Sequence, residues 1–403
     1  MRGVFILFEG LPPTVIDSQV LAHVRLARER LNIDLAIVAV ACSGAIFEAS
    51  QARLERARTA AGGEVHLVRG LRPALPGSML ANRFLLGRAL DRLGAFSFLH
   101  ARTDYAAAVA GPWGRRRGLP TLWDCRGDSA AELRERFGSR ASLLRCYRLR
   151  LSQTELRLAG QTSAAACFVT PQLRDLMEEF TVGQPSWVIP CLAPETEFFF
   201  DPELRARVRA ELSITADEVA YVYSGALNAY QRFDETVAMF RAAVARGQKA
   251  RLIVLTPEIG RAQRLCSDLR LDDIIFRSVP YAEVNGYLNA ADFGMLLRDS
   301  TPVNAVAFPT KFAEYAMTGL RVIMKAAPPA CVTVARELGN YIALGARAEP
   351  WSTAERERRA DLAARQLGRA AAMATYSEIY HRLAQRQGDG PAVRASLDAA
   401  VSR

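Results

Sequence analysis

Short apolar runs alternate with longer segments of helical periodicity along most of the 403 residues. Such alternation is typical of a parallel sheet whose two faces are covered by helices. In the first half of the chain, the predicted strands are Val4–Phe8, Leu35–Val40, Val65–Leu67, Phe96–His100, Thr121–Asp124, Ala165–Thr170 and Trp187–Ile189. The predicted helices between them include Ser18–Arg30, Ala49–Ala60 and Thr103–Arg115.

The alternation breaks near Pro190–Pro194 and then begins again. The second set of predicted strands is Val219–Ser224, Arg251–Thr256, Ile274–Val279, Phe293–Leu297 and Leu320–Lys325, with helices at Phe233–Arg246, Ile259–Leu269, Tyr281–Ala290 and Thr310–Thr318. Because the chain is too long for one small core, this pattern predicts an α/β fold of two doubly wound, Rossmann-like domains. We place the first domain at residues 1–193, the second at 194–365 and a helical segment at 366–403.

A proline and a glycine mark the two ends of a short predicted helix at Pro309–Gly319, which leads into the apolar run Arg321–Ile323. A helix N-terminus gathers unpaired amides and can bind phosphate. Lys311 and Glu314 lie three residues apart and therefore share one helix face. The segment predicts a nucleotide site, with a cation for the diphosphate and a carboxylate for the ribose, or an ordinary Lys–Glu pair on the surface.

Composition narrows the class of protein. Hydrophobic residues make up 50% of the chain and charged residues 23%, which is typical of a globular protein. The seven cysteines are scattered without a C-x-x-C pair, and the four histidines show no metal-binding spacing, so neither a disulfide framework nor a zinc site is predicted. The Glu9–Pro13 segment interrupts the first apolar run, which favours a strand and loop over a signal peptide and predicts a cytoplasmic protein.

The net charge of +10 comes with arginines that gather at Arg115–Arg117 and between Arg134 and Arg157. A basic face attracts nucleic acid, anionic lipid or phosphorylated ligands. No nucleic-acid-binding motif accompanies the charge, so nucleic acid is not an expected partner. We expect peripheral contact with an anionic membrane, at its inner face, or a charge that reflects composition alone.

The motifs, taken in order, resemble glycosyltransferase family 4, whose retaining members have the GT-B fold. The segments that carry the resemblance are Leu122–Asp128, Trp187–Phe198, Tyr223–Leu227, Ser278–Val284, Tyr287–Gly294, Pro309–Gly319 and Arg321–Ile323. The resemblance spans nearly the whole chain and is loose before residue 95. It implies an acceptor-binding first domain, a donor-binding second domain, a cleft between them and C-terminal helices that pack back on the first domain.

For the donor, the resemblance implies that Glu314 accepts hydrogen bonds from the ribose hydroxyls and that Lys311 binds the diphosphate. Thr310 opens the same helix. Gly225 would let the loop backbone approach the phosphates, because glycine has no Cβ. Ser278 and its neighbours would pack against the base.

The chain departs from the family pattern around the diphosphate. The family commonly has an arginine after the glycine and a lysine a few residues on, where this chain has Ala226 and about Gln231. Arg232 is adjacent and is expected to reach the phosphates, with Lys311 and Arg298 supplying the rest of the charge.

A second departure concerns the transferred sugar. The family often has a glutamate eight residues before the one matched by Glu314, and this chain has Val306 there. Asn304 and the backbone of its loop are the expected substitutes. A similar pattern of asparagine followed by proline, lysine and glutamate occurs in a subgroup that builds bacterial surface polysaccharides.

In the first domain, many family members place a histidine where this chain has Arg126. Arginine stays protonated and cannot act as a general base, but it can hold a sugar or a phosphate by paired donors. Asp124 and Asp128 are the expected carboxylates for orienting an acceptor hydroxyl, or caps of a loop. Gly10 and Arg102 are expected at the acceptor site.

The expected reaction transfers a sugar from a nucleoside-diphosphate sugar to a saccharide or lipid-linked acceptor. The resemblance implies retention of configuration, metal independence and no cofactor beyond the nucleotide sugar. Two alternatives stay open: a non-catalytic nucleotide-sugar-binding protein, and a nucleotide-sugar epimerase of the same architecture. A dinucleotide-dependent oxidoreductase is excluded, because no G-x-G-x-x-G follows a predicted strand.

Overall fold

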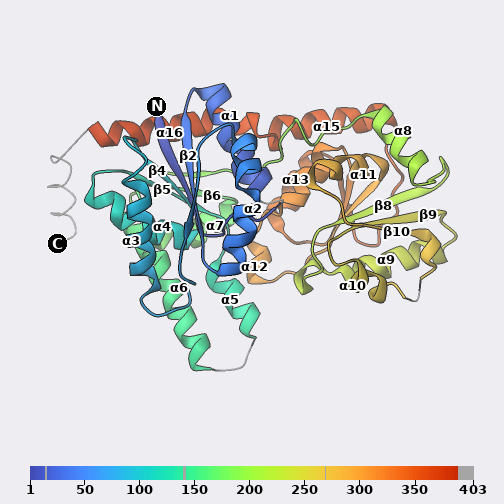
Figure 1. Ribbon diagram of the computed structural model, residues 1–403. Coiled ribbons are helices and arrows are strands. Elements are labelled where there is room, and N and C mark those ends of the chain that lie inside the picture. Colours follow the sequence, from blue (N-terminus) through green and yellow to red (C-terminus); the bar gives the residue numbers. More distant parts are fainter. Residues whose placement is uncertain (14–15, 139–141, 268, 389–403) are drawn as a thin grey trace. The chain divides into compact units, whose positions relative to one another are not determined.

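The computed structural model describes residues 1–13, 16–138, 142–267 and 269–388 (Figure 1). The described chain forms two compact units, each with its own parallel sheet. Met1–Ile189 and the described residues from Ala372 onward form the first unit, and Pro190–Ala371 forms the second. Of the predicted C-terminal helical segment, residues 389–403 lie outside the described residues.

The first unit has a seven-stranded parallel sheet in the order β3-β2-β1-β4-β5-β6-β7. Its strands are β1 Arg2–Leu7, β2 Asp34–Ala41, β3 Val65–Arg69, β4 Leu99–Arg102, β5 Thr121–Cys125, β6 Ala165–Phe168 and β7 Ser186–Val188. Its helices are α1 Ala22–Leu31, α2 Gly44–Ala61, α3 Ser78–Leu90, α4 Asp104–Arg116, α5 Ser129–Phe137, α6 Leu143–Thr162, α7 Pro171–Leu176 and α16 Met373–Gly388. A π-helical turn, Asp17–Leu21, leads into α1.

The second unit has a six-stranded parallel sheet in the order β10-β9-β8-β11-β12-β13. Its strands are β8 Val219–Ser224, β9 Ala250–Leu255, β10 Ile274–Arg277, β11 Phe293–Leu296, β12 Arg321–Met324 and β13 Tyr341–Ala343. Its helices are α8 Pro202–Glu211, α9 Phe233–Ala245, α10 Ile259–Leu265, α11 Val284–Ala290, α12 Pro302–Ala305, α13 Thr310–Met317, α14 Pro329–Glu337 and α15 Thr353–Leu367. The predicted α/β fold of two doubly wound sheets is confirmed.

Every predicted strand appears, most of them shifted by one to three residues. The predicted strand Phe96–His100 begins instead at Leu99, because Phe98 is buried in the core but precedes the paired residues. The strand β13 was not predicted, since three residues are too few to show a pattern. Between Cys125 and Ala165 the structure has α5 and α6, where the dense arginines obscured helical periodicity.

Each sheet has one point at which the strand order reverses. In the first sheet β1 is followed along the chain by β2 and β3 on one side and then by β4 on the other. In the second sheet β8 stands in the same relation to β9, β10 and β11. Ligands of doubly wound folds bind outside the carboxyl ends of the strands at such a switch point. The residues that follow β1, β4, β8 and β11 are therefore the first place to look for a site.

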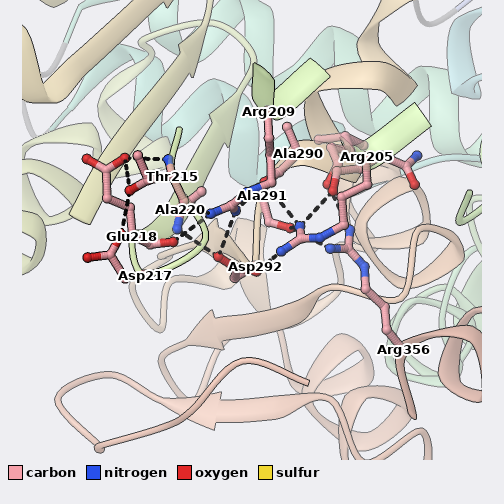
Figure 2. Close-up of polar contacts among 12 residues, drawn as sticks. Arg205, Arg209, Thr215, Asp217, Glu218, Ala220, Ala290, Ala291, Asp292 and Arg356 are labelled. Carbon is pink, nitrogen blue, oxygen red and sulfur yellow. Dashed lines mark hydrogen bonds and ion pairs between the residues drawn. The ribbon is translucent and has the colours of Figure 1, made fainter. Parts of the chain in front are cut away.

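The opposite, amino-terminal end of β11 carries a structural cluster of charges (Figure 2). Asp292, just before β11, accepts hydrogen bonds from Arg205 Nη2 at 2.6 Å, from Arg209 Nη1 at 3.4 Å and from the Ala220 amide at 2.8 Å. Arg356 Nη1 donates to the Ala291 carbonyl at 2.6 Å. These arginines satisfy the carboxylate of Asp292 and the carbonyls at the end of α11, which a helix leaves without partners.

Candidate functional site

The loop after β8 approaches α13 closely through a glycine. Gly225 has a φ of +127°, and its amide donates to the Leu255 carbonyl at 2.9 Å. A Cβ at this position would lie 3.2 Å from Lys311 Nζ. The backbone angle therefore favours glycine here, and a side chain would also crowd the ammonium group of Lys311. Tyr315 of α13 ties the two elements together, because its hydroxyl accepts a hydrogen bond from the Ser224 amide at 2.9 Å.

The N-terminus of α13 has no side-chain cap. Pro309 precedes the helix, and Thr310, its first residue, is half-buried. Lys311 Nζ lies 4.5 Å from the centre of the Tyr223 ring, a cation–π contact. In the described part of the chain no carboxylate forms an ion pair with Lys311, so the predicted alternative of a surface Lys–Glu pair does not describe this residue.

The surroundings of Lys311 disfavour its charge. Burial, and then repulsion from Arg298, lower the pKa of Lys311 to about 7, against the weaker opposing influence of Glu314. A group with this pKa is poised to become fully charged when an anion arrives.

Arg298 follows β11, the strand next to β8, and is buried. Its Nη1 donates to Asn304 Oδ1 at 3.1 Å and its Nη2 donates to Gln231 Oε1 at 3.4 Å. The guanidinium also lies 5.1 Å from the centre of the Tyr230 ring. Both acceptors are neutral amides, and among the described residues no carboxylate pairs with Arg298; burial lowers its pKa.

Asn304, which accepts the hydrogen bond from Arg298, is fully buried and is itself fixed by two further hydrogen bonds. Its Nδ2 donates to the Asp299 carbonyl at 2.9 Å, and its amide donates to Thr301 Oγ1. The predicted site residue Asn304 therefore positions Arg298 in this structure, and its contact with a sugar stays a prediction.

Glu314 is buried one helical turn after Lys311, and its Oε1 accepts a hydrogen bond from Tyr281 Oη at 3.2 Å. Burial raises the pKa of Glu314 to about 7, although Tyr281 and Lys311 favour its charged form. Tyr281 lies in the segment after β10 that also contains Ser278, which is exposed. The structure thus links the predicted ribose-binding carboxylate to the predicted base-binding segment.

Arg232 differs from the other predicted phosphate ligands. Its guanidinium forms ion pairs with Asp299 at 2.5 Å, Glu235 at 2.7 Å and Asp234 at 2.9 Å. Lys325 joins the same group through Glu235 and Asp299. Arg232 can reach a phosphate only by releasing these carboxylates, so its predicted role is weaker than that of Arg298.

At the switch point of the first sheet the charges are paired. Arg102, the last residue of β4, is buried, and its Nη1 donates to both carboxylate oxygens of Glu9, at 2.5 and 2.6 Å. Gly10, the next residue, has a φ of +68°, and a Cβ there would lie 2.6 Å from Ile46 Cγ2 and from Ser50 Oγ. The two predicted acceptor-site residues are thus close neighbours at the ends of β1 and β4.

Asp124, at the end of β5, faces two cationic or polar partners. Its Oδ1 accepts from Arg126 Nη1 at 3.3 Å, and its Oδ2 lies 3.5 Å from His100 Nε2. Burial alone would raise the pKa of Asp124, but Arg126 and His100 outweigh it and hold the pKa well below its usual range. Burial lowers the pKa of His100, whose Nδ1 lies 2.8 Å from Tyr380 Oη of α16. Asp124 is therefore a firmly ionised carboxylate.

Asp128 acts as the N-cap of α5. Its Oδ1 accepts hydrogen bonds from the amides of Ala130 at 3.0 Å and Ala131 at 2.9 Å. This is the loop-capping alternative that the sequence also allowed, and one carboxylate oxygen remains for other contacts.

Sequence reasoning missed several residues that shape these sites: Tyr223, Tyr230, Tyr281 and Glu9. Local spacing showed no sign of the roles of Tyr223, Tyr230 and Tyr281, because Lys311, Arg298 and Glu314, which they contact, lie far away in the chain. Glu9 had a usable signal, since it follows the first predicted strand at the switch point of a doubly wound sheet.

Among the described residues, no group of three or more His, Cys, Asp or Glu side chains is arranged to hold a metal ion. Of the helices in the described chain, none has both the length and the apolar character that crossing a membrane requires.

No protein-family model and no curated protein matches this chain. Solved structures do match. HepE from Anabaena, in complex with UDP, has a TM-score of 0.67 at 13% identity, over 95% of this chain and 100% of that one. Sucrose-phosphate synthase from Thermosynechococcus elongatus matches with a TM-score of 0.60 at 14% identity, over 99% of this chain and 100% of that one. WaaG, a glycosyltransferase involved in lipopolysaccharide biosynthesis, matches with a TM-score of 0.59 at 13% identity, over 95% of each chain. At these identities the likeness establishes the fold, and this chain has the GT-B fold that the sequence predicted.

Proposed function

We propose that this protein is a glycosyltransferase that takes its sugar from a nucleoside-diphosphate sugar. The observation that carries the proposal is the pair Lys311 and Arg298, two cations without carboxylate partners in the described chain, at the switch point of the second sheet. Keeping such cations unpaired in a partly buried place is unfavourable unless an anion binds there. A diphosphate has the charge and the size to satisfy both.

Different residues of the second unit bind the diphosphate, the ribose and the base. Lys311, Arg298 and the uncapped amides at the start of α13 bind the diphosphate, and Gly225 lets it approach the backbone. Glu314 accepts hydrogen bonds from the ribose hydroxyls, and the segment from Ser278 to Tyr281 packs against the base. When the bond to the sugar breaks, negative charge grows on the diphosphate, and the two cations stabilise it.

The comparisons support this donor chemistry. HepE has been solved with UDP, with UDP and glucose, and with UDP-glucose. WaaG belongs to lipopolysaccharide biosynthesis. We propose UDP or a related diphosphate as the leaving group, and a saccharide or lipid-linked acceptor in the biosynthesis of a surface polysaccharide, at the cytoplasmic face of a membrane.

For the acceptor we propose the first unit, with Asp124 orienting a hydroxyl and Arg126 holding a sugar or a phosphate. Asp128, Gly10 and Arg102 complete that proposal, although Glu9 neutralises Arg102. Retention of configuration and independence of divalent metal are part of the same proposal. A chelator should leave transfer unchanged if the cations of the chain are sufficient.

Two measurements test the proposal in turn. In a thermal-shift screen of nucleoside diphosphates and nucleotide sugars, we expect a specific increase in Tm, because a ligand that binds the folded state stabilises it by mass action. A labelled nucleotide sugar is then incubated with lipid-linked and soluble saccharides, and release of the diphosphate that requires an acceptor supports transfer. Binding without turnover would favour a non-catalytic binding protein. Conversion of the sugar without an acceptor would favour an epimerase, and no shift with any nucleotide would contradict the donor site.

A further inference from the structure

The first turns of α6 expose apolar side chains to an unusual degree. Leu143 is 91% exposed, Leu144 58% and Tyr147 36%. Figure 1 shows that the start of α6, together with the end of α5, extends away from the sheet of the first unit. We call residues Leu143–Arg150 the α6 tip. Leucines so exposed and so close together need an explanation, because scattered single apolar residues are the rule on a protein surface.

The α6 tip is also strongly basic. The whole helix contains four arginines, at positions 145, 148, 150 and 157, and one carboxylate, Glu155. Within the described residues, the guanidinium groups of Arg145, Arg148 and Arg150 form no hydrogen bond and no ion pair. Burial, and then repulsion from Asp104, raise the pKa of Glu155 to about 7 against the weaker opposing influence of Arg148, and this weakens the only negative charge of the helix. The neighbouring α5 is balanced, with two arginines and two glutamates.

A second exposed apolar pair lies on α3, and its arginines are occupied. Leu80 and Phe84 are exposed there. Arg83 donates to the carbonyls of Ala108 and Val109, and Arg88 lies 5.9 Å from the centre of the Phe84 ring. The α6 tip differs from this pair, because two adjacent exposed leucines lie there beside three arginines whose guanidinium groups form no hydrogen bond within the described chain.

We propose that the α6 tip docks on the surface of an anionic lipid bilayer. Leu143, Leu144 and Tyr147 would enter the boundary between headgroups and acyl chains, which interfacial helices penetrate by about 5–10 Å. Arg150 lies seven residues beyond Leu143, or about 10 Å along the helix. With the leucines inserted, Arg148 and Arg150 therefore lie at the depth of the lipid phosphates, and the long side chain of Arg145 can extend towards them from beside the leucines. Charge complementarity selects an anionic bilayer over a neutral one.

The docking does not depend on the proposed transfer reaction and is measured without it. Vesicles of phosphatidylcholine, with or without phosphatidylglycerol, are sedimented with the protein. We expect binding to the anionic vesicles only, and weaker binding as salt rises, because the Debye length falls from about 10 Å at 0.1 M to 3 Å at 1 M. The combined variant Arg145→Gln, Arg148→Gln and Arg150→Gln should lower the partition coefficient roughly 100-fold, since each basic residue near an anionic surface contributes about 1 kcal/mol.

The combined variant Leu143→Ser and Leu144→Ser should lower partitioning roughly tenfold by removing apolar area from the interface. Val182→Ser is the matched control: Val182 is 81% exposed and lies shortly before β7, at the amino-terminal end of the strands, whereas the α6 tip follows the carboxyl end of β5 and helix α5. Its partitioning should equal that of the unaltered protein, and the leucine variant and Val182→Ser should keep the Tm of the unaltered protein, because Leu143, Leu144 and Val182 are exposed. Equal binding by all variants, or equal binding to neutral vesicles, would overturn the proposal. So would analytical ultracentrifugation in which the leucine variant turns a dimer into a monomer, because a second copy would then cover the tip.

Discussion

The switch points of the two sheets have the same topology but differ in how their cations are paired. In the first unit, Arg102 at the end of β4 is neutralised by both carboxylate oxygens of Glu9, which follows β1. In the second unit, Arg298 follows β11 and faces the amide oxygens of Asn304 and Gln231, while Lys311 lies on the ring of Tyr223. The topology determines where a ligand can bind. The local pairing of charges determines which of the two switch points can bind an anion.

The amino-terminal end of β11 sharpens the comparison. There, Arg205 and Arg209 share the carboxylate of Asp292, and Arg356 binds a helix carbonyl (Figure 2). The second unit therefore supplies partners for arginines where they serve the fold. At the carboxyl end of the same strand, where we propose the diphosphate, Arg298 and Lys311 have no carboxylate partner among the described residues.

The largest effect is expected from Lys311→Met. Because a hydrogen bond to a charged group contributes about 1.5–3 kcal/mol, affinity for UDP should fall roughly 100-fold. The Tm without ligand should stay the same or rise, since the change removes a charge that its surroundings disfavour. Calorimetric titration and thermal melts measure the two quantities. Lys249→Met is the control, because Lys249 is exposed and paired with Asp217 at 2.5 Å. A matching loss of affinity in the control would show that the effect is not local.

Gly225→Ala should lower affinity for UDP roughly tenfold and reduce stability by about 1–3 kcal/mol, because the side chain imposes backbone strain. Its Cβ would also press on Lys311 Nζ. Denaturant unfolding gives the stability and a titration gives the affinity. Gly247→Ala, at a φ of +81° with open space around it, is the control for strain alone. Unchanged UDP affinity in Gly225→Ala would place the phosphates elsewhere.

Gln231→Glu should make the second switch point resemble the first. The new carboxylate would lie beside Arg298, as Glu9 lies beside Arg102, and would compete with the diphosphate. We expect affinity for UDP to fall roughly fivefold to tenfold, as for the loss of one charge-assisted contact. Since the side chain keeps its size, Tm should not fall. An increase in affinity would mean that Arg298 does not face the ligand.

The reverse change, Glu9→Gln, should leave donor binding untouched. It removes the charge that compensates buried Arg102, but Glu9 itself is about one-third exposed, so we expect a loss of stability of about 1 kcal/mol. Chemical denaturation measures it. A change in UDP affinity would show that Arg102 contributes to the nucleotide site and would remove the contrast between the two switch points.

The sequence predicted the sheets well because each strand leaves a local apolar signature. It also placed Lys311 and Glu314 on one helix face, since three residues separate them. It could not show that Lys311 has no carboxylate partner in the described part of the chain, because this depends on how α13 packs against β8. For the same reason it overvalued Arg232: its partner Asp299 lies 67 positions away, and nearness to the loop in sequence gave no hint of that pair.

The first unit illustrates the same limit. Asp124 and Arg126 were identified from one short segment, and they do contact one another. The partners that fix Asp124 as an anion come from elsewhere: His100 from the next strand, and behind it Tyr380 from the last helix, 280 positions from His100. Contacts across such separations follow from the tertiary structure and leave no trace in local spacing.

The most direct test of the central claim is the uptake of protons when UDP binds at pH 8, measured by calorimetry in two buffers of different ionisation enthalpy. The lowered pKa of Lys311, about 7, makes the amine mostly neutral at this pH. A bound diphosphate supplies the missing anion, so roughly one proton should be taken up per UDP as the pKa returns towards its ordinary value. We predict this uptake in the unaltered protein and none in Lys311→Met. Tight binding of UDP with no uptake of protons in the unaltered protein would contradict it.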